Sequence, residues 1–249
     1  MADAKKIAPF FEGWDDKVVL SYLQGHMGQS MADDEENPRA AQIWLGDFCY
    51  FAGRPDAALV QKAAANIIVP RDEAWASLIE TVWGGNVRKS TRYAIKKEPD
   101  AFDREKLTAF TKNLPAGCVL RLFDGALYDA AMAEAWSKDF CAQFEDKADF
   151  CRRGIGVGAL QGGTLVAGAS CYCIYNGGIE IEIGTRPDFR RRGLAAACGA
   201  RLILECLHRG LYPNWDAVDL RSVAVAEKLG YHRDKPYTVY IKEAAPARG

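Results

Sequence analysis

Residues 178 to 209 read GIEIEIGTRPDFRRRGLAAACGARLILECLHR, and the hydrophobic period changes within this stretch. In its first part, isoleucines alternate with Glu180 and Glu182, as on a strand with one apolar and one acidic face. From Gly193 onward the apolar residues recur at helical spacing, as on the buried side of a helix. Three consecutive arginines, at 190 to 192, separate the two patterns. The stretch therefore predicts a strand, an arginine-rich turn and a long helix.

The predicted turn has the properties of an anion-binding site. The first amides of a helix lack intrahelical partners, and the helix dipole favours negative charge at that end. Gly193 lets a ligand approach the backbone without a Cβ in the way, and the small Ala195 keeps the first helical turn open. The sequence therefore predicts that this turn binds a phosphate group.

Two segments carry a resemblance to a known family. Arg190-x-x-Gly193-x-Ala195 resembles the acyl-CoA-binding motif of the GNAT superfamily of N-acetyltransferases, which lies between the fourth strand and the following helix. The segment from Asp219 to Tyr231 is similar to the family's next element, a short helix with an Asn-type N-cap. Two N-terminal segments, residues 23–28 and 46–53, resemble the branch of this superfamily that includes zwittermicin A resistance proteins.

The resemblance implies an α/β (α+β) fold, with a mixed, mostly antiparallel sheet flanked by helices. We expect two domains, an N-terminal α/β lobe at residues 1–115 and an acetyl-CoA-binding GNAT domain at residues 116–249. The first lobe shows the same alternation of strands and helices but has no phosphate-binding turn of its own. We therefore expect it to be a degenerate GNAT-like domain.

One segment offers a competing interpretation. Gly154-x-Gly156-x-x-Ala159 matches the loose dinucleotide-binding fingerprint, which requires a strand before it and a helix after it. Here the run continues through a glycine turn into a second strand-like segment, residues 164–175. We therefore predict an antiparallel hairpin without a nucleotide site, preceded by one long helix over residues 126–144.

Composition and charge set further limits. A net charge of −1 over 249 residues provides no excess of positive charge that would attract nucleic acid or an anionic membrane. No apolar run is long enough for a signal sequence or a spanning helix, so we expect a cytoplasmic protein without a membrane partner. The eight cysteines are expected to be reduced and mostly buried, and Cys171-x-Cys173 lacks the spacing of a zinc knuckle. No metal site is predicted.

The resemblance implies transfer of an acetyl group from acetyl-CoA to an amine. An amine reaches such a site largely as an ammonium ion, so a nearby carboxylate that accepts its proton is useful. Glu182 and Glu180 are the candidate bases, because the corresponding strand lies against the thioester in GNAT enzymes; an ordinary exposed acidic face is the alternative. The residues expected to bind the cofactor are Ile183, Gly184, Thr185, Arg190, Arg191, Arg192, Gly193, Leu194, Ala195, Asp219 and Ser222.

The sequence departs from the family pattern at Ala226, where many GNAT enzymes place a tyrosine that protonates the departing thiolate. Tyr231, Tyr212 or a water is then the candidate acid. We expect the acceptor to be a primary amine of a small molecule that resembles an antibiotic or natural product. The alternatives are a protein or peptide N-acetyltransferase and a non-catalytic acyl-CoA-binding regulatory module, which the missing tyrosine favours.

Overall fold

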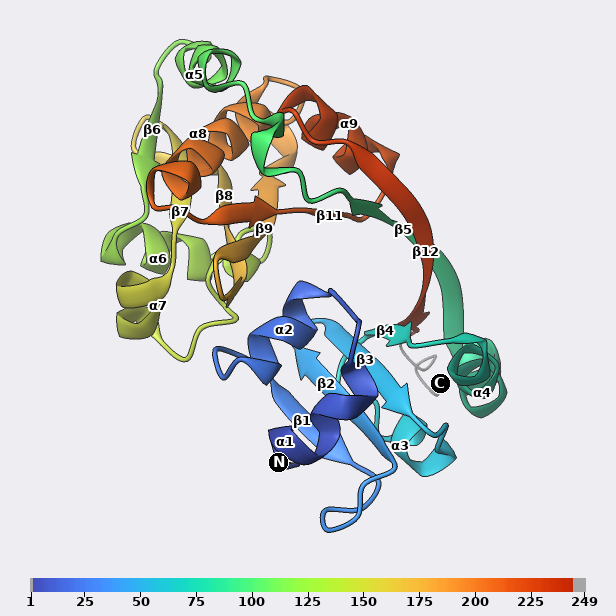
Figure 1. Ribbon diagram of the computed structural model, residues 1–249. Coiled ribbons are helices and arrows are strands. Elements are labelled where there is room, and N and C mark those ends of the chain that lie inside the picture. Colours follow the sequence, from blue (N-terminus) through green and yellow to red (C-terminus); the bar gives the residue numbers. More distant parts are fainter. Residues whose placement is uncertain (1, 244–249) are drawn as a thin grey trace, which may run out of the picture. The chain divides into compact units, whose positions relative to one another are not determined.

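The computed structural model describes residues 2–243 and divides them into two compact units (Figure 1). The described parts of unit 1 are residues 2–92 and 236–243, and unit 2 is Tyr93–Lys235. This division differs from the expected boundary between residues 115 and 116. The chain leaves unit 1 along β5 (Val87–Ile95) and returns to it along β12 (Arg233–Lys242). The return is a long-range pairing that no local sequence pattern indicates.

Unit 1 is built on a mixed sheet whose strands adjoin in the order β1-β2-β3-β4-β12-β5. The pairs β1/β2, β2/β3 and β4/β12 are antiparallel, whereas β3 and β4 are parallel. Its elements before β5 are α1 (Ala4–Ile7), the 3-10 turn η1 (Ala8–Phe11), α2 (Lys17–Leu23), β1 (Gln29–Ala32), β2 (Ala40–Leu45), β3 (Phe48–Gly53), α3 (Ala57–Gln61), β4 (Ile67–Pro70), α4 (Glu73–Trp83) and the 3-10 turn η2 (Gly84–Asn86).

The core of unit 1 depends on the returning strand. Phe51 of β3 and Trp75 of α4 lie with ring centroids 5.1 Å apart, and the Trp75 indole N–H donates to Gly53 O over 3.0 Å. Tyr240 of β12 belongs to the same buried cluster. The C-terminal strand therefore completes a core that the first 92 residues begin.

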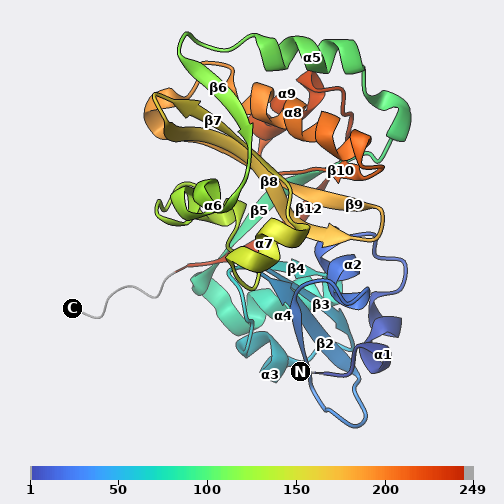
Figure 2. The same cartoon turned by 90° about the vertical axis from the view of Figure 1, so that its left-hand side faces the viewer.

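Unit 2 contains a second sheet, ordered β10-β9-β8-β7-β6, in which only β10 and β9 are parallel. The helix α8 packs on one face of this sheet, with α5 packed against α8, and α6 lies on the other face with α7 packed against α6 (Figure 2). Its elements are η3 (Pro99–Ala101), α5 (Arg104–Lys112), β6 (Cys118–Leu122), α6 (Gly125–Met132), η4 (Lys138–Phe140), α7 (Lys147–Arg153), β7 (Gly156–Gln161), β8 (Thr164–Tyr175), β9 (Gly178–Thr185), η5 (Pro187–Phe189), α8 (Leu194–His208), β10 (Tyr212–Asn214), β11 (Asp216–Ala217) and α9 (Leu220–Lys228).

Two expectations about the middle of the chain have different outcomes. The antiparallel hairpin is confirmed as β7 and β8, so the dinucleotide fingerprint has no helix after it. The single helix predicted over residues 126–144 is wrong, because α6 ends at Met132 and only the short η4 follows it within this range. Ser137 donates its hydroxyl to Ala131 O over 2.9 Å, and Phe140 turns inward to lie over Gly168 and Gly184. That tertiary contact is worth more than the helical propensity of the alanine-rich segment.

The two units share a sequence of elements. In unit 1, β3 is followed by α3, the parallel strand β4 and α4; in unit 2, β9 is followed by α8, the parallel strand β10 and, after β11, α9. Both pairs of parallel strands continue an antiparallel ladder on their other side. Within residues 2–243, no helix combines the length and the apolar character needed to cross a bilayer.

Candidate active site

The predicted strand, turn and helix are β9, η5 with the residues after it, and α8. Arg191 has φ 62° and Gly193 has φ 80°, so two residues in this turn adopt the left-handed conformation. Arg191 is the only non-glycine residue among the described ones with a positive φ. A side chain in this region costs about 1–2 kcal/mol, and such strain is typical of functional turns.

The start of α8 presents unusually many backbone N–H groups. Ala197 N is the first amide of the helix to find an acceptor, Gly193 O at 3.1 Å. In the part of the chain that the structure describes, the amides from Arg191 to Ala196 have no hydrogen-bond acceptor. Gly193 caps the helix without a side chain, and nothing lies within 4 Å of the place that a Cβ would occupy. The turn is therefore open to an anion that accepts from these donors.

The other α-helices among residues 2–243 begin differently. Each follows an aspartate whose carboxylate accepts a hydrogen bond from a backbone N–H of the first turn, as a favourable N-cap does. These aspartates are Asp3, Asp16, Asp56, Asp72, Asp103, Asp124, Asp146 and Asp219. α8 differs from these helices because Gly193 supplies no carboxylate, so its first amides are left to solvent or to a ligand.

The three arginines of the turn were all expected to bind the cofactor, but their side chains make different contacts. The Arg190 guanidinium donates to Thr185 O over 3.3 Å. Arg192 donates to Asp188 O over 3.0 Å and lies 4.6 Å above the Phe189 ring. Arg191 has no side-chain partner among the described residues and is exposed. Its guanidinium is therefore the least engaged of the three, although all three side chains are exposed.

Beside this turn, one edge of β9 is open. β10 pairs with β9 only from Gly178 to Glu180. After Asn214 the chain turns away, because Asp216 and Ala217 pair with β5 at Ala94 and Tyr93 of the same unit. Within the described residues, no strand pairs with β9 on this side beyond Glu180.

The open edge offers the backbone groups of alternate residues. Arg186 N donates to Val166 O, so the even-numbered residues of this part of β9, including Gly184, face the β8 ladder. Ile183 and Thr185 therefore direct their backbone groups to the open edge, where Thr185 O already accepts from Arg190. Gly184, which is expected to bind the cofactor, also gives room to the Phe140 ring, since a Cβ there would lie 3.1 Å from that ring.

Glu180 and Glu182 share the face of β9 opposite α8. Glu180 is buried, with 9% exposure, and its Oε2 accepts a hydrogen bond from Asn214 Nδ2 over 2.5 Å. Glu182 is half-buried and lies opposite Ser170 of β8. The Ile183 side chain projects from the other face toward Gly199 of α8. The expectation of an ordinary exposed acidic face does not describe these carboxylates, since neither is exposed.

Three other residues expected at the cofactor site have structural contacts. Asp219 caps α9 and forms a two-pronged ion pair with Arg221, which holds the pKa of Asp219 below its usual value. Ser222 Oγ accepts a hydrogen bond from the Trp215 indole N–H over 3.1 Å. The side chain of Leu194 is buried in the core.

The two candidate acids are both held by the backbone. Tyr231 is 2% exposed and donates its hydroxyl to Pro213 O over 2.5 Å, and burial raises its pKa well above the usual value. Tyr212 donates to Lys96 O and accepts from Glu98 N, and burial also raises its pKa. Ala226 is fully buried. Among the described residues, position 226 therefore supplies no tyrosine hydroxyl, and the hydroxyls of Tyr231 and Tyr212 are both bound to backbone groups.

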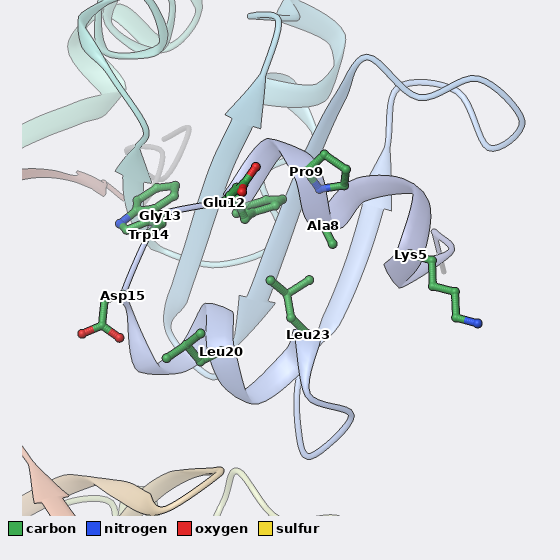
Figure 3. A pocket seen from close by; sticks show the side chains of 10 residues that line it. Lys5, Ala8, Pro9, Glu12, Gly13, Trp14, Asp15, Leu20 and Leu23 are labelled. Carbon is green, nitrogen blue, oxygen red and sulfur yellow. The ribbon is translucent and has the colours of Figure 1, made fainter.

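A separate open pocket of about 580 Å³ lies in unit 1. Figure 3 shows Leu23 of α2 pointing toward Ala8 of η1, with Asp15 and Lys5 at opposite ends. None of the residues predicted for the cofactor or for catalysis lines it. The lining residues are Lys5, Ala8, Pro9, Phe11, Glu12, Gly13, Trp14, Asp15, Leu20 and Leu23.

Comparison with known proteins agrees with this architecture. Residues 8–240 match the family model described as GNAT acetyltransferase. A GCN5-related N-acetyltransferase-like protein from Streptococcus suis 89/1591, of known crystal structure, is 41% identical, with a TM-score of 0.92 over 96% of this chain and 98% of that one. The chain therefore belongs to the GNAT acetyltransferase family, which confirms the predicted fold class and the assignment to the acetyltransferases.

Two more distant proteins are also similar. The uncharacterized N-acetyltransferase YdfB of Bacillus subtilis (strain 168) is 23% identical over 258 residues, which cover 95% of each chain. A GCN5-related N-acetyltransferase from Kribbella flavida is 18% identical, with a TM-score of 0.58 over 100% of this chain and 98% of that chain. The second similarity concerns the fold alone.

Proposed function

We propose that this protein transfers an acetyl group from acetyl-CoA to a primary amine of a small molecule. The observation that carries the proposal is the adjacency of three features in one unit. An uncapped helix N-terminus with free amides follows directly after the open edge of β9, and two carboxylates lie on a face of that same strand. GNAT enzymes generally use acetyl-CoA, and the arrangement supports that donor here.

The proposed donor site uses the turn and the strand edge together. The pyrophosphate accepts from the amides of Arg191 to Ala195, and the Arg191 guanidinium adds charge. The pantetheine arm pairs with the backbone of Ile183 and Thr185 on the open edge. Because it lies on this edge, the Ile183 N–H is positioned to stabilise the negative charge that develops on the thioester carbonyl oxygen. When bound, acetyl-CoA supplies the activated acetyl group.

At the acceptor, we assign proton removal to Glu182. It is half-buried and therefore reachable, whereas Glu180 is buried and bonded to Asn214. The ammonium group loses one proton to the carboxylate, the neutral nitrogen forms the new C–N bond, and the C–S bond breaks. The attacking nitrogen loses its second proton as the amide forms, and this proton passes through water to the departing thiolate, since both nearby tyrosine hydroxyls are bound to backbone groups.

The experiment compares Glu182→Gln with Glu227→Gln, the same change at an exposed position of α9. Acetyl-CoA affinity is measured by calorimetry, and thiol release is measured with a panel of primary amines. We expect Glu182→Gln to lower kcat about 10²- to 10⁴-fold with unchanged acetyl-CoA affinity, and Glu227→Gln to behave like the parent. Full activity of Glu182→Gln would remove the assignment of the base.

The second candidate is a non-catalytic acyl-CoA-binding module, which Ala226 favours because the family's usual acid is missing there. Acetyl-CoA binding without thiol release for any amine, small or peptidic, would support it. A peptide acceptor is distinguished in the same assay, because a protein or peptide N-acetyltransferase would release thiol only with peptides.

We also propose that unit 1 is a degenerate GNAT-like domain. The support is the shared series of elements, in which β3, α3 and β4 correspond to β9, α8 and β10. The difference lies at the helix start, where Asp56 caps α3 with its own carboxylate and thereby takes the place of an anion. The resemblance to the zwittermicin A resistance branch is finer than the family membership and stays a prediction.

A further inference from the structure

One row of residues crosses three strands of unit 2 next to the candidate carboxylates. Tyr175 of β8 and Tyr212 of β10 are both register partners of Gly178 of β9. The Tyr175 hydroxyl contacts the place that a Cβ of Gly178 would occupy, so its ring lies across the glycine. The two aromatic rings therefore stand on one face of the sheet with no side chain between them.

An ammonium group already lies against these rings. Lys97 Nζ is 5.5 Å from the centroid of Tyr175 and 5.5 Å from that of Tyr212. The two tyrosines are 3% and 8% exposed, whereas Lys97 is exposed and makes no ion pair with a carboxylate of the described residues. Ring faces attract cations because of their quadrupole, so two such faces form a site for an ammonium ion.

The carboxylates of the active site continue the same face. Glu180 and Asn214 are each two residues beyond the row, along β9 and β10 respectively, and Glu182 is two residues further on. At about 3.3 Å per residue, the backbone positions of Glu180 and Glu182 lie roughly 7 and 13 Å from the tyrosine row along β9. An acceptor that places one amine at a carboxylate can thus reach the rings with a second amine.

We propose that Tyr175 and Tyr212 bind a second ammonium group of the acceptor, that Lys97 covers this site in its absence, and that the acceptors are linear diamines or polyamines. The inference rests on the proposed function for the reacting amine. The second ammonium group replaces that of Lys97 between the same two rings. Lys97 is then an internal competitor of the acceptor.

The test uses binding without turnover. Calorimetry without acetyl-CoA measures 1,5-diaminopentane and 1,8-diaminooctane against 5-aminopentan-1-ol and 8-aminooctan-1-ol, which replace the second ammonium with a hydroxyl. We expect 1,8-diaminooctane to bind at least tenfold more tightly than its amino alcohol. The shorter 1,5-diaminopentane spans only about the 7 Å to Glu180 and should show a smaller preference. Lys97→Gln should tighten diamine binding about fivefold and leave the amino alcohols unchanged, because only the diamines compete with Lys97.

Variants of the rings complete the test. Tyr212→Phe keeps the ring face and should retain most of the diamine preference, whereas Tyr212→Leu should abolish it. Equal affinity for diamines and amino alcohols, or no effect of Lys97→Gln on diamine binding, would overturn the inference. Lys97-dependent diamine binding without thiol release in the presence of acetyl-CoA would contradict the proposed function and leave the ammonium site intact. Thiol release with monoamines as fast as with diamines would overturn the ammonium site alone.

Discussion

Asn214 Nδ2 donates a 2.5 Å hydrogen bond to Glu180 Oε2 at the last residue pair over which β9 and β10 run side by side. Both side chains are only 9% exposed. The bond lies at the point where the two strands separate, and it fixes a buried carboxylate next to the open edge of β9. The opening of the edge and the position of the acidic face are therefore coupled.

Asn214→Ala should destabilise unit 2. It removes a donor from a buried carboxylate, and leaving such a group without that partner costs about 1–3 kcal/mol. Urea unfolding measures the change, with Asn113→Ala, at an exposed position, as the control. Equal midpoints for the two variants would show that Glu180 does not depend on this bond.

Gly193→Glu should abolish acetyl-CoA binding and leave the protein folded. The new carboxylate projects into the open space beside the free amides, where it repels a phosphate. Gly163→Glu is a matched control, because Gly163 has φ +84° against +80° at Gly193 and a Cβ at either position would have nothing within 4 Å of it. Both variants carry a left-handed side chain at a cost of about 1–2 kcal/mol. Calorimetry with acetyl-CoA separates them, and similar affinities would disprove the anion site.

Arg191→Gly should stabilise the fold while weakening the donor affinity. Glycine adopts φ 62° without the Cβ penalty, so the free energy of unfolding should rise by about 1 kcal/mol. Loss of the unpartnered guanidinium should raise the acetyl-CoA Kd about tenfold, which is about 1.4 kcal/mol. Thermal unfolding and calorimetry are measured on the same preparation. A variant that is less stable than the parent would contradict the assignment of strain to Arg191.

The ionised carboxylate of Asp149 should stabilise the fold, and this contribution to the free energy of unfolding should be lost in acid. Its buried carboxylate accepts from Arg152 and Arg153, and these hydrogen bonds hold its pKa far below the usual value. Because the folded pKa is lower than the unfolded value of about 3.9, the contribution is complete above that pH and is lost as pH falls toward the folded pKa.

Urea unfolding between pH 2 and pH 7 tests this pair. Asp149→Asn should lower stability at pH 7 by about 2 kcal/mol or more and flatten the decline in acid. Asp129→Asn, which breaks the exposed pair with Lys147, should change stability by less than about 1 kcal/mol. An unchanged acid slope in Asp149→Asn would assign the acid dependence to other groups.

Local patterns were sufficient for much of the candidate site. The alternation around Glu180 and Glu182 predicted β9, and the apolar spacing after Gly193 predicted α8. Both patterns reflect interactions over a few residues and the burial of one face. The different contacts of the three arginines could not be predicted from the sequence, because they depend on which carbonyl accepts from each guanidinium after the turn has formed.

Contacts between distant segments decided the remainder. The chain forms β11 against Tyr93 and Ala94, which draws it away from β9 and opens the edge. Phe140 packs on Gly168 and Gly184, which breaks the helix that the alanine-rich segment favours.

The sequence by itself determined the strand, the turn, the long helix and the glycine at its start, because steric and dipolar effects act between near neighbours. Only the tertiary structure decided where β9 is left unpaired, that β12 completes unit 1, and that Lys97 meets Tyr175 and Tyr212. Those relationships join residues that are far apart along the chain, and the free energy of closing such long loops is repaid only when the whole core is assembled.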